Sequence, residues 1–190
     1  MDLILASGSP RRRELLQCAG FEFRVLTSDA DERYSAQLQP LEVAPFLARQ
    51  KARAVAATLT AEQLEHSVLV GADTIVALDG VIYGKPADDA DARRMLGELS
   101  GRTHQVITGV CVLAPSGEHC FAEQTDVSFR SLSAAEIDEY VASGEPLDKA
   151  GAYGIQGLGG ALVASTKGDF DNVVGLPITR LTPLLKKLLA

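Results

Sequence analysis

The fold is decided by one stretch rich in β-branched residues, SVLVGADTIVALDGVIYGKP (residues 67–86). Its apolar run predicts a strand that is buried within a sheet. The dipeptide Asp79-Gly80 interrupts the run, and this pair is a strong signal for a two-residue hairpin turn. The chain therefore turns back beside its own strand, so the sheet must contain antiparallel neighbours.

The flanking sequence supplies further strands and several helices. Pro115-Ser116-Gly117 predicts a second hairpin within residues 104–130. Helices are predicted near 10–19, 43–59, 89–101, 133–144 and 178–190, short strands over 3–7, 21–28 and 161–165, and a loop over 167–177. This mixture predicts an α/β fold with a mixed, twisted central sheet flanked by helices. At 190 residues, the chain is expected to form a single domain over 1–190.

The composition is that of a soluble globular protein with an acidic balance. Hydrophobic residues make up 46%, charged residues 23%, and the net charge is −7. An acidic chain is a poor general binder of nucleic acid, so no nucleic-acid partner is expected. A small anionic ligand stays possible where basic residues gather locally. The sequence has no run of 18 apolar residues, so no membrane span is expected.

The cysteines favour a reducing location. The sequence has three cysteines, which is an odd number, and none of them form a CxxC motif: Cys18, Cys111 and Cys120. This pattern predicts no disulfide framework and a cytoplasmic protein.

The segment SGSPRRRELL (7–16) places three arginines where they are electrostatically disfavoured. Ser9 is the predicted N-cap and Pro10 the first helical residue. A strand that runs through a glycine turn into a helix is suited to bind an anion. Cations in the first turn oppose the helix dipole, and an anionic ligand would offset this loss. The pattern alone leaves open that the arginines are solvated surface charges.

Asp73 is the strongest single candidate for catalysis. It lies inside the apolar run VLVGADTIVAL, although aspartate is depleted from strands and costly to bury. It therefore needs a cation, a strand end or a bulge. A proton acceptor and a metal ligand are both compatible with this position, and an Asx-turn at a strand break is the structural alternative.

Seven motifs occur in order along the chain: LASGSPRRREL, RQKA, GADTIV, GKP, SGRTHQVITGV, DKAGAYGIQG and GDFDNVVGLP. Together they resemble the Maf family of nucleoside triphosphate pyrophosphatases and span residues 5–177. GADT and DKAGAYGIQG resemble the subgroup that acts on dTTP and UTP. The resemblance implies a two-lobed ITPase-like fold with the nucleotide in the cleft, and a homodimer.

The resemblance also implies a role for individual residues. Asp73 matches the proposed proton acceptor. The triphosphate would be held by Ser7, Arg11, Arg12, Lys51 and Lys85, and base choice would be set by Arg12, Thr74 and Gln156. A glutamine amide can donate and accept at once, as the edge of uracil or thymine requires. Arg13 falls outside the match and is expected at the surface. Lys51 as a solvated helix residue and Lys85 as a hairpin-end charge remain alternatives.

A divalent cation, Mg²⁺, Mn²⁺ or Co²⁺, is the implied cofactor. Asp73 and Glu32 are its candidate ligands, and Glu32 belongs to an acidic group with Asp29 and Asp31. A solvated acidic loop is the alternative reading of that group. Asp169 and Asp171 are lesser candidates of the same kind.

The implied reaction is attack of water on the α-phosphorus of dTTP, UTP and modified pyrimidine triphosphates, which yields the monophosphate and pyrophosphate. Such an enzyme would remove noncanonical nucleotides. The alternative is a nucleotide-binding regulator of cell division and septum formation with little turnover. Asp73 distinguishes the enzyme from the regulator. A protein that only binds triphosphate gains nothing from an additional carboxylate near the phosphates, whereas a hydrolase needs one. GVIYGKP lacks the glycine spacing and the Ser/Thr of a P-loop, so a Walker-type ATPase is disfavoured.

Overall fold

The computed structural model of the chain describes residues 1–27, 29–30 and 32–190. Within them, one mixed sheet has the strand order β2-β1-β3-β5-β6-β7, and β4 pairs with β3 outside this path. The strands are β1 (Asp2–Leu5), β2 (Arg24–Val25), β3 (Ser67–Leu78), β4 (Val81–Tyr83), β5 (Thr103–Ala114), β6 (Gly117–Phe129) and β7 (Val163–Lys167). β1 runs parallel to β2 and β3, and the other pairs are antiparallel. The predicted mixed α/β sheet is confirmed.

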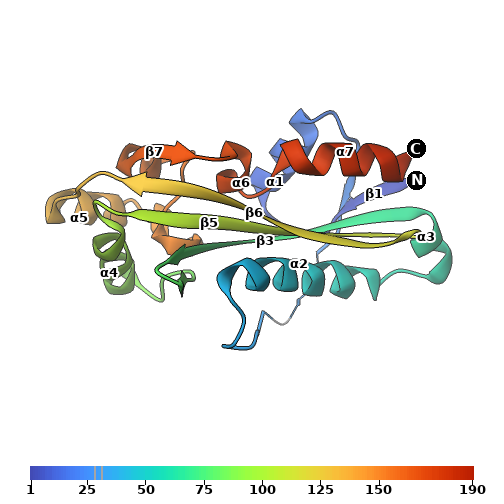
Figure 1. Ribbon diagram of the computed structural model, residues 1–190, viewed down its shortest axis with the longest axis horizontal. Coiled ribbons are helices and arrows are strands. Elements are labelled where there is room, and N and C mark those ends of the chain that lie inside the picture. Colours follow the sequence, from blue (N-terminus) through green and yellow to red (C-terminus); the bar gives the residue numbers. More distant parts are fainter. Residues whose placement is uncertain (28, 31) are drawn as a thin grey trace.

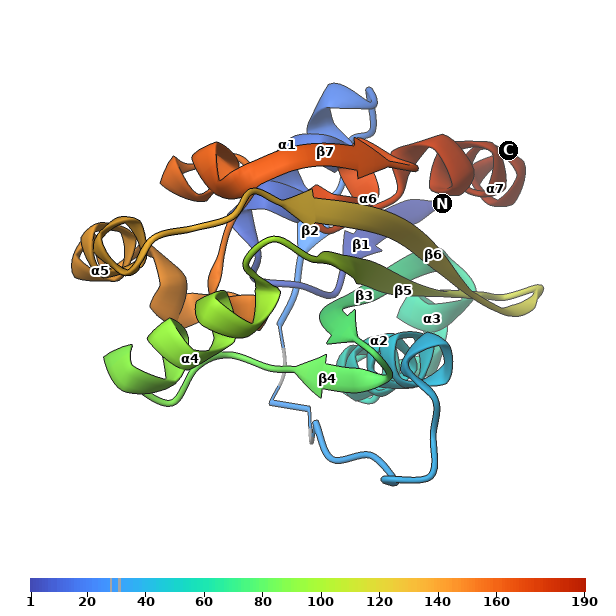
Figure 2. The same cartoon turned by 60° about the vertical axis from the view of Figure 1, so that its left-hand side comes forward.

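The first hairpin forms where the sequence predicts it. Asp79 and Gly80 have φ angles of +51° and +80°, the left-handed backbone that a tight turn between twisted strands requires. β3 ends at Leu78 and β4 begins at Val81. The turn leaves β4 on one side of β3 and the β5–β6 hairpin on the other, so β3 lies inside the sheet (Figure 2).

Helices cover both faces of the sheet and one end of it (Figure 1). They are α1 (Pro10–Cys18), α2 (Pro40–Ala56), α3 (Ala61–Glu65), α4 (Asp89–Leu99), α5 (Ala134–Ala142), α6 (Phe170–Val174) and α7 (Ile178–Leu189), with 3₁₀ turns η1 (Glu145–Asp148), η2 (Ala150–Ala152) and η3 (Leu158–Leu162). α2 lies on one face of β3 and β5, whereas α1, α6 and α7 lie on the other. α4 and α5 build a second lobe at the end of the long strands, with its own apolar core. None of the helices in the described part of the chain is both long enough and apolar enough to span a bilayer.

α2 approaches the sheet unusually closely because two strand positions carry no side chain. A Cβ atom at Gly109 of β5 would overlap backbone atoms of Ala44 and Pro45 in α2. A Cβ atom at Gly71 of β3 would overlap the backbone of Ala48 and would lie 2.8 Å from the Cβ atom of Ala52. These glycines determine the distance between α2 and the sheet, and therefore how far the side chains of α2 reach toward the sheet.

Three local predictions need correction. Residues 167–177 are not only a loop, because α6 forms within them and is capped by the Asp169 side chain. The strand predicted over 21–28 shrinks to the two residues of β2, and Ser28 lies outside the described residues. The short helix α3 has no counterpart in the sequence analysis. A five-residue helix spans little more than one turn, so it shows no periodicity by which sequence reasoning could find it.

The prediction that the cysteines form no disulfide is also wrong, because Cys111 of β5 and Cys120 of β6 form one. They are directly opposite in the register of the two strands, with Cα atoms 4.2 Å apart. Such facing pairs bring side chains close enough to bond. Cys18 is free and exposed.

His104 gives the fold a dependence on pH. Its ring is completely buried, its Nε2 atom lies 2.8 Å from the Tyr153 hydroxyl, and burial lowers its pKa to about 4. The unfolded chain takes up this proton near pH 6.5, so unfolding becomes easier as the pH falls from about 6.5 to 4.

We expect this effect to reach about 3 kcal/mol at full amplitude. Urea unfolding of the parent and of His104→Gln between pH 4 and 7 measures it, and the variant should show the shallower dependence of unfolding free energy on pH. His119→Gln, at an exposed position, is the control. Equal slopes in all three proteins would contradict the expectation.

Candidate active site

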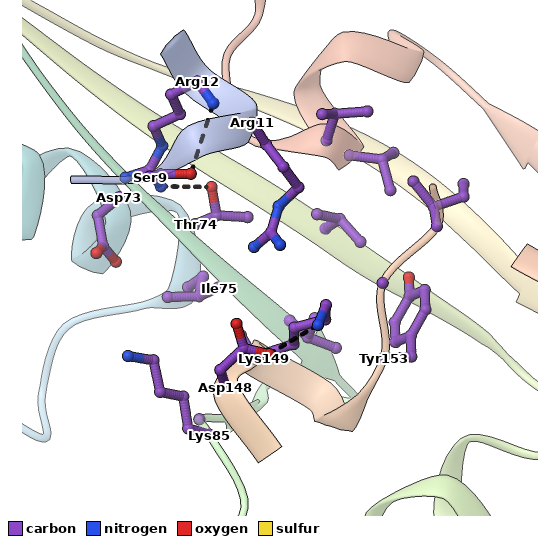
Figure 3. Close-up of a pocket in the computed structure, with 18 of the residues that line it drawn as sticks. Ser9, Arg11, Arg12, Asp73, Thr74, Ile75, Lys85, Asp148, Lys149 and Tyr153 are labelled. Atoms are coloured by element: carbon purple, nitrogen blue, oxygen red, sulfur yellow. Dashed lines mark hydrogen bonds and ion pairs between the residues drawn. The ribbon is translucent and has the colours of Figure 1, made fainter. Parts of the chain in front are cut away.

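A cavity of about 900 Å³ opens between the two lobes. It is lined by the residues to which the family resemblance gives a substrate or metal role: Ser7, Arg11, Arg12, Glu32, Lys51, Asp73, Thr74, Lys85 and Gln156. Figure 3 shows Asp73, Thr74 and Ile75 along one strand, with Arg11 and Arg12 on one side and Lys85 on the other. Residues from six separate segments of the chain therefore meet in one place.

The sheet topology explains this meeting. β1 pairs with the first residues of β3, and its chain then turns into α1 beside the middle of β3. The Ser9 side chain caps α1, and Pro10 is its first residue, as predicted. The turn after β4 brings Lys85 back toward the same part of β3.

Asp73 is buried and ion-paired. Its Oδ1 atom lies 2.5 Å from Nζ of Lys51, which reaches down from α2. Glu32 approaches the same Nζ atom, with its Oε1 atom at 2.9 Å. The hydrogen bond from Lys51 holds the pKa of Glu32 below its ordinary value. Two carboxylates thus converge on one cation at the edge of the cavity.

The guanidinium of Arg12 donates three hydrogen bonds to neighbouring residues. Its Nε donates to the carbonyl oxygen of Gly175 at 2.8 Å, Nη1 to the Ser7 hydroxyl at 3.1 Å, and Nη2 to the Thr74 hydroxyl at 3.0 Å. Burial lowers the pKa of Arg12, and Asp73 partly opposes this shift. All three acceptors are uncharged, so the guanidinium keeps its full charge and two of its five N–H bonds for a ligand.

Arg11 and Lys85 line the same cavity and form no hydrogen bond or ion pair with any described residue. Figure 3 shows the Arg11 side chain reaching toward the middle of the cavity. Together with Arg12 and Lys51 they outnumber the carboxylates of Asp73 and Glu32 at this end. In a chain with a net charge of −7, such a local positive excess is suited to a polyanion.

The other end of the cavity is bounded by the glycine-rich segment that carries Gln156, and Asp148, Lys149 and Tyr153 line it there (Figure 3). Glu145, which sequence reasoning missed, organises this segment. Its carboxylate accepts hydrogen bonds from the backbone N–H groups of Leu158 and Gly159 and from the Tyr140 hydroxyl. Burial raises the pKa of Glu145, but these bonds hold it below its ordinary value. A glutamate inside SGEP has no sequence signal for this role.

The carboxylates of Asp73 and Glu32 suit a hard divalent cation. Both oxygens already meet at a positive charge, the Lys51 ammonium, and Mg²⁺ commonly takes one or two carboxylates plus phosphate oxygens. Asp29 lines a recess of about 220 Å³ beside Glu32, whereas Asp31 lies outside the described residues. Asp169 instead caps α6, and neither it nor Asp171 lines the large cavity.

One other group of potential metal ligands exists among the described residues: Cys111, Glu118 and Cys120. Its two cysteines are joined as a disulfide, and Glu118 pairs with Arg49 and Arg53. With no thiolate and with two guanidinium groups at its carboxylate, this group does not suit a cation in the oxidised state.

Replacing Arg12 by Ala should weaken both stability and substrate binding. The change leaves the Gly175 carbonyl without its partner, and we expect unfolding to become easier by about 1–3 kcal/mol. KM for the substrate should rise, because two free N–H donors are lost. Thermal unfolding and steady-state kinetics measure the two effects, with exposed Arg13→Ala as the matched control. A variant with the parent's melting temperature and KM would refute this assignment.

Comparisons with known proteins show what the chain is similar to. A family profile described as "Maf-like protein" matches residues 2–188. A protein of Bacillus cereus (strain AH820) named "dTTP/UTP pyrophosphatase" is 49% identical over 97% of this chain and 94% of its own length. A protein of Bacillus cytotoxicus with the same name is 50% identical over the same shares. The Staphylococcus aureus Ham1 protein, a solved structure, has 16% identity over 68% of this chain and 72% of its own, with a TM-score of 0.49.

Proposed function

Because this chain belongs to the family of Maf-like proteins, we propose that it is a nucleoside triphosphate pyrophosphatase that acts on dTTP and UTP. The reaction takes one triphosphate and one water and yields the nucleoside monophosphate and pyrophosphate. Modified pyrimidine triphosphates that share the same base edge are further substrates, so the enzyme removes noncanonical nucleotides from the pool.

The observation that carries the proposal is the concentration of cations in the cavity. One end gathers Arg11, Arg12, Lys51 and Lys85 around a buried carboxylate, and the other end is bounded by a glycine-rich segment, where Asp148, Lys149 and Tyr153 also lie (Figure 3). A triphosphate fits the first end, and the base would lie between Thr74 and the glycine-rich segment. Such fixed cations stabilise the negative charge that develops on the departing pyrophosphate.

Asp73 is the proposed proton acceptor. Its position at the middle of β3 holds the carboxylate in place, and the Lys51 ammonium fixes its orientation. A water between Asp73 and the α-phosphorus would lose its proton to Oδ while its oxygen forms the new P–O bond. The bond between the α-phosphorus and the bridging oxygen breaks, and pyrophosphate leaves toward the cations.

Asp73 and Glu32 would hold a divalent cation, which we propose to be Mg²⁺, Mn²⁺ or Co²⁺. When bound, it supplies Lewis-acid neutralisation of the phosphate oxygens. Lys51 then keeps the two carboxylates together between turnovers, since its Nζ atom contacts both.

The test is an assay of the purified chain with UTP, dTTP, CTP, ATP and GTP in the presence of each cation. Pyrophosphate and orthophosphate are measured separately. We expect pyrophosphate from UTP and dTTP and a requirement for a divalent cation. Orthophosphate as the product, or equal rates with purines, would contradict the proposal.

The regulatory alternative predicts a different outcome of the same assay. A nucleotide-binding regulator of septum formation would bind UTP without releasing pyrophosphate. The names of the relatives favour the enzyme. We extend the proposal to a homodimer in the cytoplasm, which sedimentation equilibrium and localisation of a tagged chain would test.

A further inference from the structure

A chain of hydroxyl groups runs from the cavity into the core. Arg12 Nη2 donates to the Thr74 hydroxyl, Oγ1 of Thr74 lies 2.9 Å from Oγ1 of Thr108, and Oγ1 of Thr108 lies 2.9 Å from the carbonyl oxygen of Asn172. Thr74 and Thr108 are directly opposite on β3 and β5. Thr108 is completely buried, whereas Thr74 lines the cavity.

The far end of this chain fixes the direction of every hydrogen bond in it. A carbonyl oxygen can only accept, so the single proton of Thr108 goes to Asn172. Thr108 must then accept the proton of Thr74. The Thr74 hydroxyl has given its proton inward, and one of its two lone pairs accepts from Arg12. Only one lone pair is left to face the cavity.

The side chain of Asn172 is anchored as well, and it holds the backbone carbonyl that accepts from Thr108 in place. Its Oδ1 accepts from the backbone N–H of Thr108 at 3.1 Å, and its Nδ2 donates to the carbonyl of Val106 at 3.0 Å. The Nδ2 group also donates to the Thr125 hydroxyl at 2.9 Å, whose own proton goes to the carbonyl of Asp169. Each partner admits one orientation of the amide, and Asn172 is completely buried.

We propose that Thr108 is a positioning residue for base specificity, because it makes Thr74 an obligate hydrogen-bond acceptor for the imide N3–H of uracil or thymine. The inference rests on the proposed function and adds to it a reason for rejecting cytosine. Cytosine carries a lone pair at N3, which would face the lone pair of Thr74. A site built to bond one donor discriminates against the analogue that lacks it.

The test compares kcat/KM for UTP and CTP in the parent, Thr108→Val and Thr108→Ser. Valine keeps the branched shape but removes the hydroxyl, so the Thr74 proton becomes free to turn toward the cavity and meet N3 of cytosine. We expect the ratio of UTP to CTP to fall about tenfold, the effect of one hydrogen bond. Serine keeps the hydroxyl and should retain the parent's ratio.

Thr125→Val is the matched control for loss of packing. It removes another completely buried hydroxyl that bonds Asn172, but one that has no contact with Thr74. It should lower the melting temperature as Thr108→Val does and leave the UTP to CTP ratio unchanged. A fall in the ratio in both variants would show a general structural effect and overturn the proposal.

A further nucleotide tests whether Thr108 affects recognition of the base or recognition of the sugar. Thymidine triphosphate lacking the 3′-hydroxyl is compared with dTTP, because a ribose hydroxyl could also donate to Thr74. We expect Thr108→Val to leave this second ratio unchanged, and a change confined to it would overturn the assignment to the base. If the parent hydrolyses neither UTP nor dTTP, the proposed function fails. If it prefers UTP and Thr108→Val keeps that preference, only this inference fails.

Discussion

Replacing Asp73 by Asn should lower kcat for UTP by about 10²- to 10⁴-fold, the usual contribution of a general base. Asparagine has the same shape but cannot take a proton from water. Asp73 is 9% exposed and its Oδ1 contacts the Lys51 ammonium, so the substitution changes charge without opening space. Lys51 keeps Glu32 as a partner, and the fold should persist.

Binding of the triphosphate should survive this substitution or become tighter, because one negative charge leaves a cavity that holds a polyanion. Calorimetric titration with a UTP analogue that has a non-hydrolysable α,β-bridge measures this, and pyrophosphate release measures kcat. Asp79→Asn, the same chemical change in the exposed turn at the end of the same strand, should leave both unchanged. Full turnover in Asp73→Asn would remove the proposed mechanism.

Replacing Gly109 by Ala should destabilise the protein by about 3 kcal/mol. The added methyl group would overlap backbone atoms of Ala44 and Pro45, which cannot turn aside as the end of a flexible side chain would. α2 must therefore move away from the sheet. Gly109 is directly opposite Asp73 in the register of β3 and β5, so this movement also draws Lys51 away from the carboxylate.

Urea unfolding and pyrophosphate release measure the two consequences of Gly109→Ala. The matched control is Gly97→Ala, in the exposed face of α4 with no atom within 4 Å of the added group. That variant should be more stable than the parent by up to about 1 kcal/mol, because alanine favours the helix. Equal stability of Gly109→Ala and the parent would mean that α2 does not depend on this close approach.

Local signals predicted most of the fold because they act over a few residues. Asp79-Gly80 determines a turn by its left-handed backbone, and the helix predicted near 133–144 begins at a capping box of Ser133 with Glu136. α6 escaped prediction because five residues show no periodicity. Its stability comes from the Asp169 cap and from the buried bonds of Asn172, which join segments about 65 residues apart.

The candidate site was predictable only where charge stands out against its surroundings. Asp73 in an apolar strand and arginines at a helix start are conspicuous, and the family resemblance supplied Lys51, Lys85 and Gln156. Thr108 gave no signal, since threonine is ordinary in strands and its importance arises from register. Cys111 and Cys120 face each other because the turn observed is the two residues Pro115-Ser116, whereas the prediction placed a three-residue turn at Pro115-Ser116-Gly117.

The bond between Arg12 and the Gly175 carbonyl joins positions 163 residues apart, and this separation has a consequence for synthesis on the ribosome. At roughly 5–20 residues per second, on the order of 10 s pass between the emergence of the guanidinium and that of its acceptor. During that interval a nascent chain carries its arginines with no finished pocket around them. The pocket can therefore be completed only after Gly175 has emerged, long after the arginines that line it.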